Sequence, residues 1–304
     1  MTPTSLAPVR VSILGVLAVL FAAACWASSG IFVKLILVSA PLSSLLLAFW
    51  RDTAAFAVFL TLALSAGPRT LKIKREDIPW LTGMGFSLGV FHVALNLSYI
   101  LNGVSVTTIQ QAVMPAIVLV AARVIWNEPL TGMKLCSLAL IGIGTVLVSG
   151  LLRSDLPDIT TGGILVGLLV PVLYAGWSLF GKALRAGYSA VTTLTWAFGI
   201  AALILLPCQF VAGAILPPPL PGVTYLWFAG LICVSTAAGF LAFIFALGRL
   251  PAGIATLLVM TEIVFAVAYA YLILNETLAA IEVAGGVLIM TGVAFTVIRQ
   301  NGTI

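Results

Sequence analysis

The chain has very little charge and very few residues that could hold a metal ion or carry out acid–base chemistry. Charged residues make up 8% of its 304 residues, against roughly 25% in an ordinary soluble protein. It has one histidine, His92, and four cysteines that lie far apart in apolar segments. This composition excludes a multi-histidine metal site, a zinc pattern and a disulfide framework, so neither a metal nor a cofactor is expected.

Hydrophobic residues are too abundant for a protein that folds in water. They form 62% of the chain, and the mean hydropathy is +1.23, so there is too little polar surface to cover a water-facing globule. We therefore expect an all-α integral membrane protein in contact with the lipid bilayer. Ten helical spans of about 20 residues leave only short loops, which excludes a pump with its own nucleotide-binding domain.

Uncharged runs and chain breakers predict where the ten spans lie. The run 78–122 has no charge over 45 residues, about 67 Å as a helix and twice a bilayer. It must therefore fold back, and Asn102-Gly103 is the expected break. A second double run is broken by the proline-rich stretch 217–222. The predicted segments are 11–33, 41–66, the double run 78–122, 135–152, 159–181, the double run 186–248, 252–274 and 278–298.

The positions of lysine and arginine predict the orientation in the membrane. With the N-terminus in the cytoplasm, eleven positive residues face inward, whereas Lys34 and Arg153 face outward and Arg51 lies within a span. This asymmetry follows the positive-inside rule. We expect both termini to be cytoplasmic. In a membrane protein the positions of the charges matter more than their sum. The net charge of +5 therefore does not indicate a nucleic-acid partner.

Short motifs recur in the same order in the two halves of the chain. Trp-Asn-Glu-Pro-Leu at 126–130 recurs as Leu-Asn-Glu-Thr-Leu at 274–278, and a Gly-rich span follows each copy. Cys-Trp-Ala-Ser-Ser-Gly at 25–30 is similar to Gly-Trp-Ser-Leu-Phe-Gly at 176–181. The motifs predict two five-helix repeats, 11–152 and 159–298. Because five is odd, the second repeat is inverted relative to the first.

Ten spans in two halves, with a glutamate after spans four and nine, resemble the EamA branch of the drug/metabolite transporter superfamily. Pro115 in span four matches a proline usual in that branch, and the resemblance covers essentially the whole chain. Glu262-Ile263 stands where the family commonly has Glu-Pro, which leaves the kink of that span without its proline. In length and in its aromatic and amide residues the chain is most similar to the YddG-type exporters of aromatic amino acids. The resemblance implies a multi-pass exporter in the cell inner (plasma) membrane.

Polar residues in span three occupy one helical face. Gly85, Gly89, His92, Asn96 and Tyr99 follow one another at steps of four, three, four and three, which places them on the same side of a helix. Polar groups avoid lipid, so this face either lines a water-filled path or packs on another helix. We expect the glycines to serve packing and the other three residues to line the path.

Spans four and six carry further polar candidates. Gln110 and Gln111 lie about one turn before Pro115, and a proline in a span frees a backbone carbonyl that neighbouring polar groups re-satisfy. One glutamine can serve that purpose while the other presents its amide to a substrate. Tyr174 and Ser178 share one face of span six.

The tryptophans fall into two groups. Trp80, Trp126 and Trp227 lie near span ends, where an interfacial aromatic belt explains them. Trp26 and Trp177 are mid-span and related by the repeat. Such rings hold an aromatic ligand by stacking or an organic cation by cation–π contact, or they simply pack.

Three charged residues lie within spans. Arg51 and Asp52 are adjacent, so they point about 100° apart and each is expected to find a partner on another helix. Glu262 lies in the middle of span nine. It can bind a substrate ammonium group, carry protons, or serve as a satisfied structural acid.

These features favour a secondary transporter that works by alternating access around a central site. The expected partners are small molecules, chiefly aromatic amino acids and then organic cations, and the alternatives are other amino acids, metabolites or organic-cation drugs. A membrane-embedded transferase would need an acid–base pair or metal cluster, and a channel would not require inverted halves. No catalytic residue is expected, and a monomer is the working expectation. The predicted substrate-binding residues are Trp26, His92, Asn96, Tyr99, Gln110, Gln111, Tyr174, Trp177, Ser178 and Glu262.

Overall fold

The computed structural model describes residues 12–40, 42–149, 160–213, 220–274 and 279–298, and every element within them is helical. The α-helices are α1 Ile13–Ala27, α2 Ser29–Ser39, α3 Ser44–Ser65, α4 Ile78–Gln111, α5 Met114–Trp126, α6 Gly132–Val148, α7 Thr161–Leu184, α8 Ala190–Ala212, α9 Gly222–Gly230, α10 Gly239–Leu247, α11 Ala252–Val259, α12 Thr261–Leu274 and α13 Ala280–Ile298. Two short 3₁₀ turns, η1 Pro68–Leu71 and η2 Arg75–Asp77, precede α4, and a π-helix, η3 Leu231–Ala238, joins α9 to α10.

The helices supply the ten predicted spans. Nine helical segments among the described residues are long and apolar enough to cross a membrane, and the 17-residue α6 is a shorter apolar helix. Span one is longer than predicted, because it runs over Ile13–Ser39 and so continues past Lys34. A lysine near a span end can extend its amine toward the interface, so it need not end the helix.

The chain folds back inside α4, as predicted. Ser98 Oγ lies 2.8 Å from Thr107 Oγ1, and Asn102 Nδ2 donates to Gln110 Oε1 over 3.2 Å. In a straight helix, residues nine apart are about 13 Å apart along the axis. The chain therefore reverses between Ser98 and Thr107, which separates span three from span four.

Hydroxyl side chains start several helices. The side-chain oxygens of Ser12, Ser43, Thr131, Thr160 and Ser189 each accept a hydrogen bond from a backbone N–H in the first turn of the helix that follows. These are N-cap interactions, which satisfy donors that the helix itself leaves free. They fix the start of α1, α3, α6, α7 and α8.

Four spans are interrupted in mid-membrane. Span one breaks at Ser28 between α1 and α2, span four at 112–113 before Pro115, and span nine at Met260 between α11 and α12. Span eight contains η3, and π-helical turns occur often at functional sites. The breaks in spans four and nine are 148 residues apart, as are Glu128 and Glu276.

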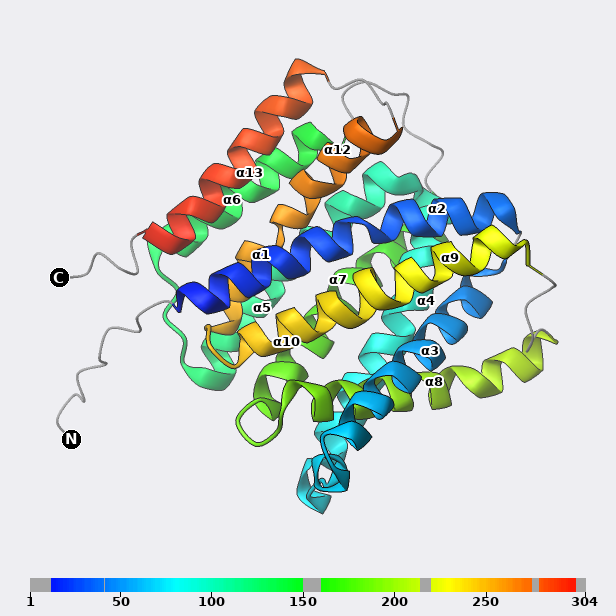
Figure 1. Ribbon diagram of the computed structural model, residues 1–304. Coiled ribbons are helices and arrows are strands. Elements are labelled where there is room, and N and C mark those ends of the chain that lie inside the picture. The colour runs from blue at the N-terminus through cyan, green and yellow to red at the C-terminus, as the bar shows by residue number, and fades with distance from the viewer. Residues whose placement is uncertain (1–11, 41, 150–159, 214–219, 275–278, 299–304) are drawn as a thin grey trace, which may run out of the picture.

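The two halves cross symmetrically where α6 and α13 lie side by side (Figure 1). A Cβ atom on Gly144 would lie 2.6 Å from the carbonyl oxygen of Gly285, and one on Gly292 would lie 2.9 Å from that of Ser137. A shift of 148 residues converts the first contact into the second. α1 begins and α13 ends on the same side of the molecule, at the left of Figure 1, as an even number of spans requires.

Small residues of span three pack against span seven. A Cβ atom on Gly85 would lie 2.6 Å from Ile200 Cβ, and one on Gly89 would lie 3.2 Å from Ala201 Cα. The expectation that these glycines serve helix packing is confirmed. The contact brings the neighbouring His92 into the buried centre of the molecule, where it is fully buried.

Candidate functional site

Buried charge is concentrated on α3, and its two charged residues have separate partners. Asp52 Oδ1 lies 2.6 Å from His92 Nδ1 on α4, whereas Arg51 donates from Nε to Thr236 Oγ1 in η3 over 3.0 Å. Arg51 is 7% exposed and Asp52 is fully buried. The prediction that each residue finds its partner on another helix is confirmed.

Glu262 and two tyrosines lie near Arg51. Glu262 lies in the first turn of α12, which begins at Thr261 directly after the break at Met260. The Arg51 guanidinium interacts electrostatically with Glu262 and Tyr99, and Tyr174 interacts with both Glu262 and Tyr99. These groups come from spans two, three, six and nine, so both halves of the chain contribute.

Glu262 and Tyr99 are less buried than Arg51 and Asp52. Each residue keeps part of its surface uncovered by protein atoms. They lie on α12 and α4, one in each repeat.

A group of aromatic side chains, the ring cluster, lies beside these polar groups. Its members are Trp26, Phe91, Tyr174, Trp177, Phe240 and Phe243, each at most 7% exposed. The rings of Tyr174 and Trp177 are stacked with centroids 5.7 Å apart, and Trp26 contacts Phe240 and Phe243 at 5.1 Å each. These separations are typical of favourable aromatic pairs.

The ring cluster contains unsatisfied polar groups. Within the described residues, the indole nitrogens of Trp26 and Trp177 and the hydroxyl of Ser178 are buried and have no hydrogen-bond partner. In this structure the two tryptophans and Ser178 pack against their neighbours, so a binding role for them stays a prediction. Sequence reasoning missed the three phenylalanines, because a phenylalanine in an apolar span carries no signal of its own.

The amide residues lie in different surroundings. Gln110 accepts from Asn102 Nδ2 and presses against α7, where a Cβ atom on Gly167 would overlap its amide. Asn102 also donates to the Gly163 carbonyl over 2.7 Å. Gln110 thus joins spans three, four and six at the reversal of α4. Asn96 makes a long 3.4 Å contact to the Ser44 carbonyl, and Gln111 is partly exposed.

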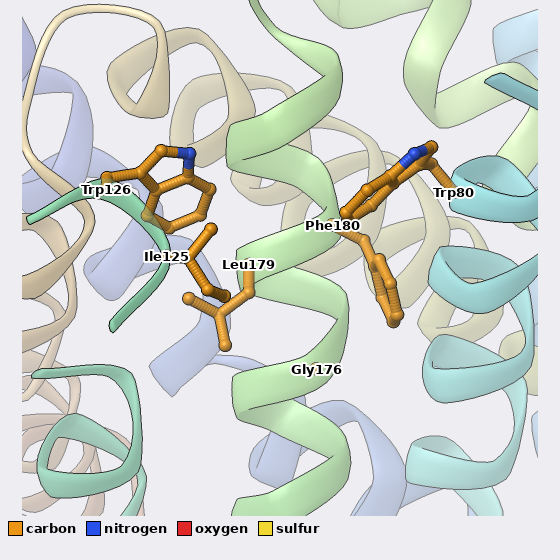
Figure 2. Close-up of a pocket in the computed structure, with 6 residues that line it drawn as sticks. All are labelled: Trp80, Ile125, Trp126, Gly176, Leu179 and Phe180. Carbon is orange, nitrogen blue, oxygen red and sulfur yellow. The ribbon is translucent and has the colours of Figure 1, made fainter. Parts of the chain in front are cut away.

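A separate apolar pocket lies across α7 and contains none of these polar groups. It has a volume of about 120 Å³ and is lined by Trp80, Ile125, Trp126, Gly176, Leu179 and Phe180. Figure 2 shows Ile125 and Trp126 beside Leu179 on one side of α7, and Trp80 against Phe180 on the other. Apolar lining and two span-end tryptophans fit a surface in contact with lipid. Among the described residues, no cluster of three histidine, cysteine, aspartate or glutamate side chains could hold a metal ion.

Comparison with known proteins identifies the family. The EamA-like transporter family matches residues 13–150 and 161–298, one match in each half. The chain belongs to this family. It is 27% identical over 266 residues to an uncharacterized transporter of Archaeoglobus fulgidus, covering 86% of this chain and 90% of that protein. It is 25% identical over 236 residues to the uncharacterized transporter YxxF of Bacillus subtilis, covering 77% and 74%.

The fold is also shared with a solved crystal structure. That chain superposes with a TM-score of 0.78 at 15% identity, over 95% of this chain and 98% of the other. At this identity the likeness concerns the fold alone. The chain is therefore a multi-pass EamA-like membrane transporter with ten spans in two five-helix repeats.

Two of the sequence motifs have a defined local structure. The span-nine break is present at Met260 although Ile263 stands in place of the family's proline, so the interruption does not depend on a proline. The first Asn-Glu motif caps a helix, because Glu128 accepts from the backbone N–H groups of Ala252 and Gly253 over 2.9 and 3.4 Å. The second copy, at 275–278, lies outside the described residues.

A lysine joins the ends of neighbouring spans close to this motif. Lys182 Nζ at the end of α7 donates to the carbonyl oxygens of Leu247 and Leu250 over 2.8 and 2.6 Å. Lys134 Nζ lies 3.7 Å from Glu128. A cation at carbonyl groups and an anion at a helix N-terminus are both favourable, so these contacts hold spans four, six, eight and nine together on this side.

Proposed function

We propose that this chain exports aromatic amino acids from the cytoplasm, as a secondary transporter that works by alternating access. The observation that carries the proposal is the ring cluster, to which both repeats contribute side chains and which contacts the polar ring of His92. Rings and apolar walls suit an aromatic side chain, and polar groups suit its ammonium and carboxylate. Broken helices at such a site are typical of secondary transporters.

The residues proposed to line the path in this conformation are Asn96, Tyr99, Gln111 and Glu262, with Trp26, His92, Gln110, Tyr174, Trp177 and Ser178 as further candidates. The first four are only partly buried, whereas the second group is engaged in packing or hydrogen bonding in this conformation. A rearrangement of the repeats would be needed to expose the packed group to substrate.

We also propose that both termini are cytoplasmic in the cell inner membrane. Eleven of the 14 lysines and arginines then face inward, as the positive-inside rule favours. The contacts of Glu128 and Lys182 would close the cytoplasmic side.

Flat organic cations are a second candidate substrate class. The carboxyl group of Glu262 lies within electrostatic range of the Tyr174 ring, and a carboxylate beside aromatic rings favours cation binding. Phosphorylated substrates fit less well, because several inward-facing cations would be needed to bind the phosphate.

Uptake into proteoliposomes tests the proposal. Purified protein should catalyse saturable counterflow of radiolabelled phenylalanine and tryptophan, and empty liposomes should not. Parallel assays with leucine, an organic cation and a sugar phosphate define the class, and a pH gradient tests proton coupling. Transport of sugar phosphate without any aromatic amino acid would overturn the substrate assignment and leave the transporter fold intact.

A further inference from the structure

Asp52 and His92 form a titratable pair that is sealed inside the first repeat. Asp52 Oδ1 lies 2.6 Å from His92 Nδ1, and both side chains are fully buried. The two residues lie on α3 and α4, in the middle of spans two and three. Acidic and imidazole side chains within membrane spans are rare, and they often mark ion pathways and proton relays. The pair is therefore a candidate for a role in transport.

The second ring nitrogen of His92 has no partner. In the described part of the chain, His92 Nε2 and Asp52 Oδ2 are buried atoms without a hydrogen bond. When Nδ1–H of a neutral imidazole donates to an ionised Asp52, Nε2 keeps a bare lone pair. A buried acceptor without a donor is costly and calls for an explanation. Nε2 is thus a position that can take up one proton while the hydrogen bond to Asp52 remains.

The Asp52 carboxylate has a positive charge near it whether or not that proton is bound. Arg51, the preceding residue on α3, is 7% exposed and donates from Nε to Thr236. While the imidazole is neutral, the Arg51 guanidinium is the nearby counter-charge. Once Nε2 is protonated, the imidazolium itself pairs with the carboxylate, as a charge-assisted hydrogen bond. Both protonation states of the pair are therefore supported inside the protein.

Few other titratable groups face the pair. On α4 itself and on the helices packed against α3 and α4, the titratable side chains within the described spans are two tyrosines and two exposed cysteines, namely Tyr99 on α4, Tyr174 on α7, Cys208 on α8 and Cys233 on η3. α10 has no titratable residue, and the charged residues of η1, η2, α6 and α7 lie at span ends. Among these elements, Arg51 is the charge that acts on the pair.

Rings of the second repeat cover His92. The centroid of its ring lies 6.3 Å from that of Phe198 on α8 and 5.9 Å from that of Phe240 on α10. Asp52 and His92 both belong to the first repeat, whereas the two phenylalanines belong to the second. Alternating access moves one repeat relative to the other. Such a movement would uncover the imidazole while its hydrogen bond to Asp52 stays within one repeat.

We propose that His92 is the proton-binding site that drives transport, taking up a proton at Nε2 from the outside and releasing it to the cytoplasm while Asp52 stabilises the imidazolium. The inference rests on the proposed function and deepens it by naming the coupled ion. His92 contacts Phe91 and Phe240 of the ring cluster, so an imidazolium and a substrate ammonium group would place like charges in one small region. Each disfavours the other, which is what exchange of a proton for an outgoing solute requires.

Proton movement in proteoliposomes tests the site. Liposomes that contain purified protein, a trapped pH-sensitive dye and an acidic interior receive phenylalanine from outside, with the membrane potential clamped. The unmodified protein should release protons as it takes up phenylalanine, and a gradient of about one pH unit should hold about tenfold accumulation for one-to-one exchange. Phenylalanine counterflow at equal pH on both sides is measured in parallel, because it reports substrate transport without net proton movement.

His92→Gln can still donate a hydrogen bond to Asp52 but cannot titrate, so it should keep counterflow and lose both the accumulation and the dye signal. Its counterflow should also no longer fall at acidic pH, where protons compete with substrate in the unmodified protein. A purely structural role would change the amount of folded protein and not this pH profile. If His92→Gln fails to fold, Asp52→Leu combined with His92→Leu removes both titratable groups without stranding either and should behave in the same way. Glu76→Gln, whose side chain is 73% exposed before α4, is the control and should keep the coupling.

The results distinguish this inference from the proposed function. If the folded variants still accumulate phenylalanine on a pH gradient, or if Glu262→Gln alone abolishes coupling, the proton does not bind at His92 and aromatic transport stands. If the folded variants lose counterflow as well, His92 contacts the substrate and the proton site is wrong. An unmodified protein that exchanges phenylalanine without moving protons would also overturn the site. If protons move with another solute but not with phenylalanine, and the variants abolish that movement, the proton site holds and the aromatic assignment falls.

Discussion

At the scale of single residues, the pair formed by Asp52 and His92 joins spans two and three. The two groups are fully buried and 2.6 Å apart, while Asp52 Oδ2 and His92 Nε2 have no partner in the described structure. A buried polar pair contributes little net stability compared with an apolar replacement, but removal of one partner leaves the other unsatisfied.

The pair makes a double-mutant prediction. His92→Leu alone should destabilise the folded protein by about 3–5 kcal/mol because it strands the Asp52 carboxylate, whereas Asp52→Leu combined with His92→Leu should cost much less. Thermal unfolding of the purified protein in detergent measures both. If the loss of stability in the double variant equalled the sum of the losses in His92→Leu alone and Asp52→Leu alone, the two residues would not be coupled.

A second residue-scale prediction separates path residues from packing residues. Alanine at Asn96, Tyr99 or Gln111 should weaken transport about tenfold, as loss of one ligand contact does, and leave the amount of folded protein unchanged. Alanine at buried Trp177 should instead lower stability by about 3–5 kcal/mol.

Trp80 and Trp227 are the controls for that set, since their alanine variants should affect neither transport nor folding strongly. Transport is measured in proteoliposomes, and folded protein by size-exclusion chromatography. Equal damage in the path and control sets, or none in either, would remove the assignment of the path.

Sequence reasoning found part of this site. Adjacent positions for Arg51 and Asp52 sufficed to predict partners on different helices, because helix geometry points them apart. The pattern could not show that Thr236 and His92 are those partners, since each lies on a span distant in sequence. The phenylalanines of the ring cluster could not be told from apolar residues that face lipid.

At the scale of elements, hydropathy predicted the spans and their order but not their interior breaks. Charge-free runs mark membrane segments regardless of local backbone shape. Asn102-Gly103 and the proline-rich stretch 217–222 marked the two reversals that length made necessary. The breaks at Ser28 and Met260 and the π-helix η3 have no proline within them. Because no proline marks these positions, a search of the sequence for chain breakers does not find them.

The crossing of α6 and α13 allows a matched glycine test. Gly144→Ala should destabilise the protein by about 1–3 kcal/mol, because its Cβ atom would lie 2.6 Å from the Gly285 carbonyl oxygen and overpacking carries such a cost. Gly142→Ala on the same helix meets nothing within 4 Å, so it should be neutral or stabilising through better helix propensity.

Thermal unfolding in detergent compares the two variants with the unmodified protein. The sign of the difference is the decisive result, since both substitutions add the same methyl group to α6. If Gly142→Ala proved as harmful as Gly144→Ala, close approach of α6 and α13 could not be the cause.

At the scale of the whole molecule, the repeat links the sequence motifs to the architecture. The shift of 148 residues that relates the two Asn-Glu motifs also relates the breaks in spans four and nine and the glycine contacts between α6 and α13. The positions of the two Asn-Glu motifs in the sequence already give this shift. The broken helices differ in detail, since span one breaks at Ser28 while α7 in span six is continuous, so the two halves are similar without being identical.

The topology of the inverted repeats gives the final prediction. Single cysteines at Lys72, which follows η1 between spans two and three, and at Leu220, which precedes α9, should react with a membrane-impermeant thiol reagent from opposite sides. Both would be placed in a background without Cys25, Cys136, Cys208 and Cys233. An odd number of spans, five, separates the two positions, and the lysines and arginines near position 72 place it inside. Position 72 should therefore label only in permeabilised cells and position 220 also in intact cells, whereas labelling of both in intact cells would contradict the inverted arrangement.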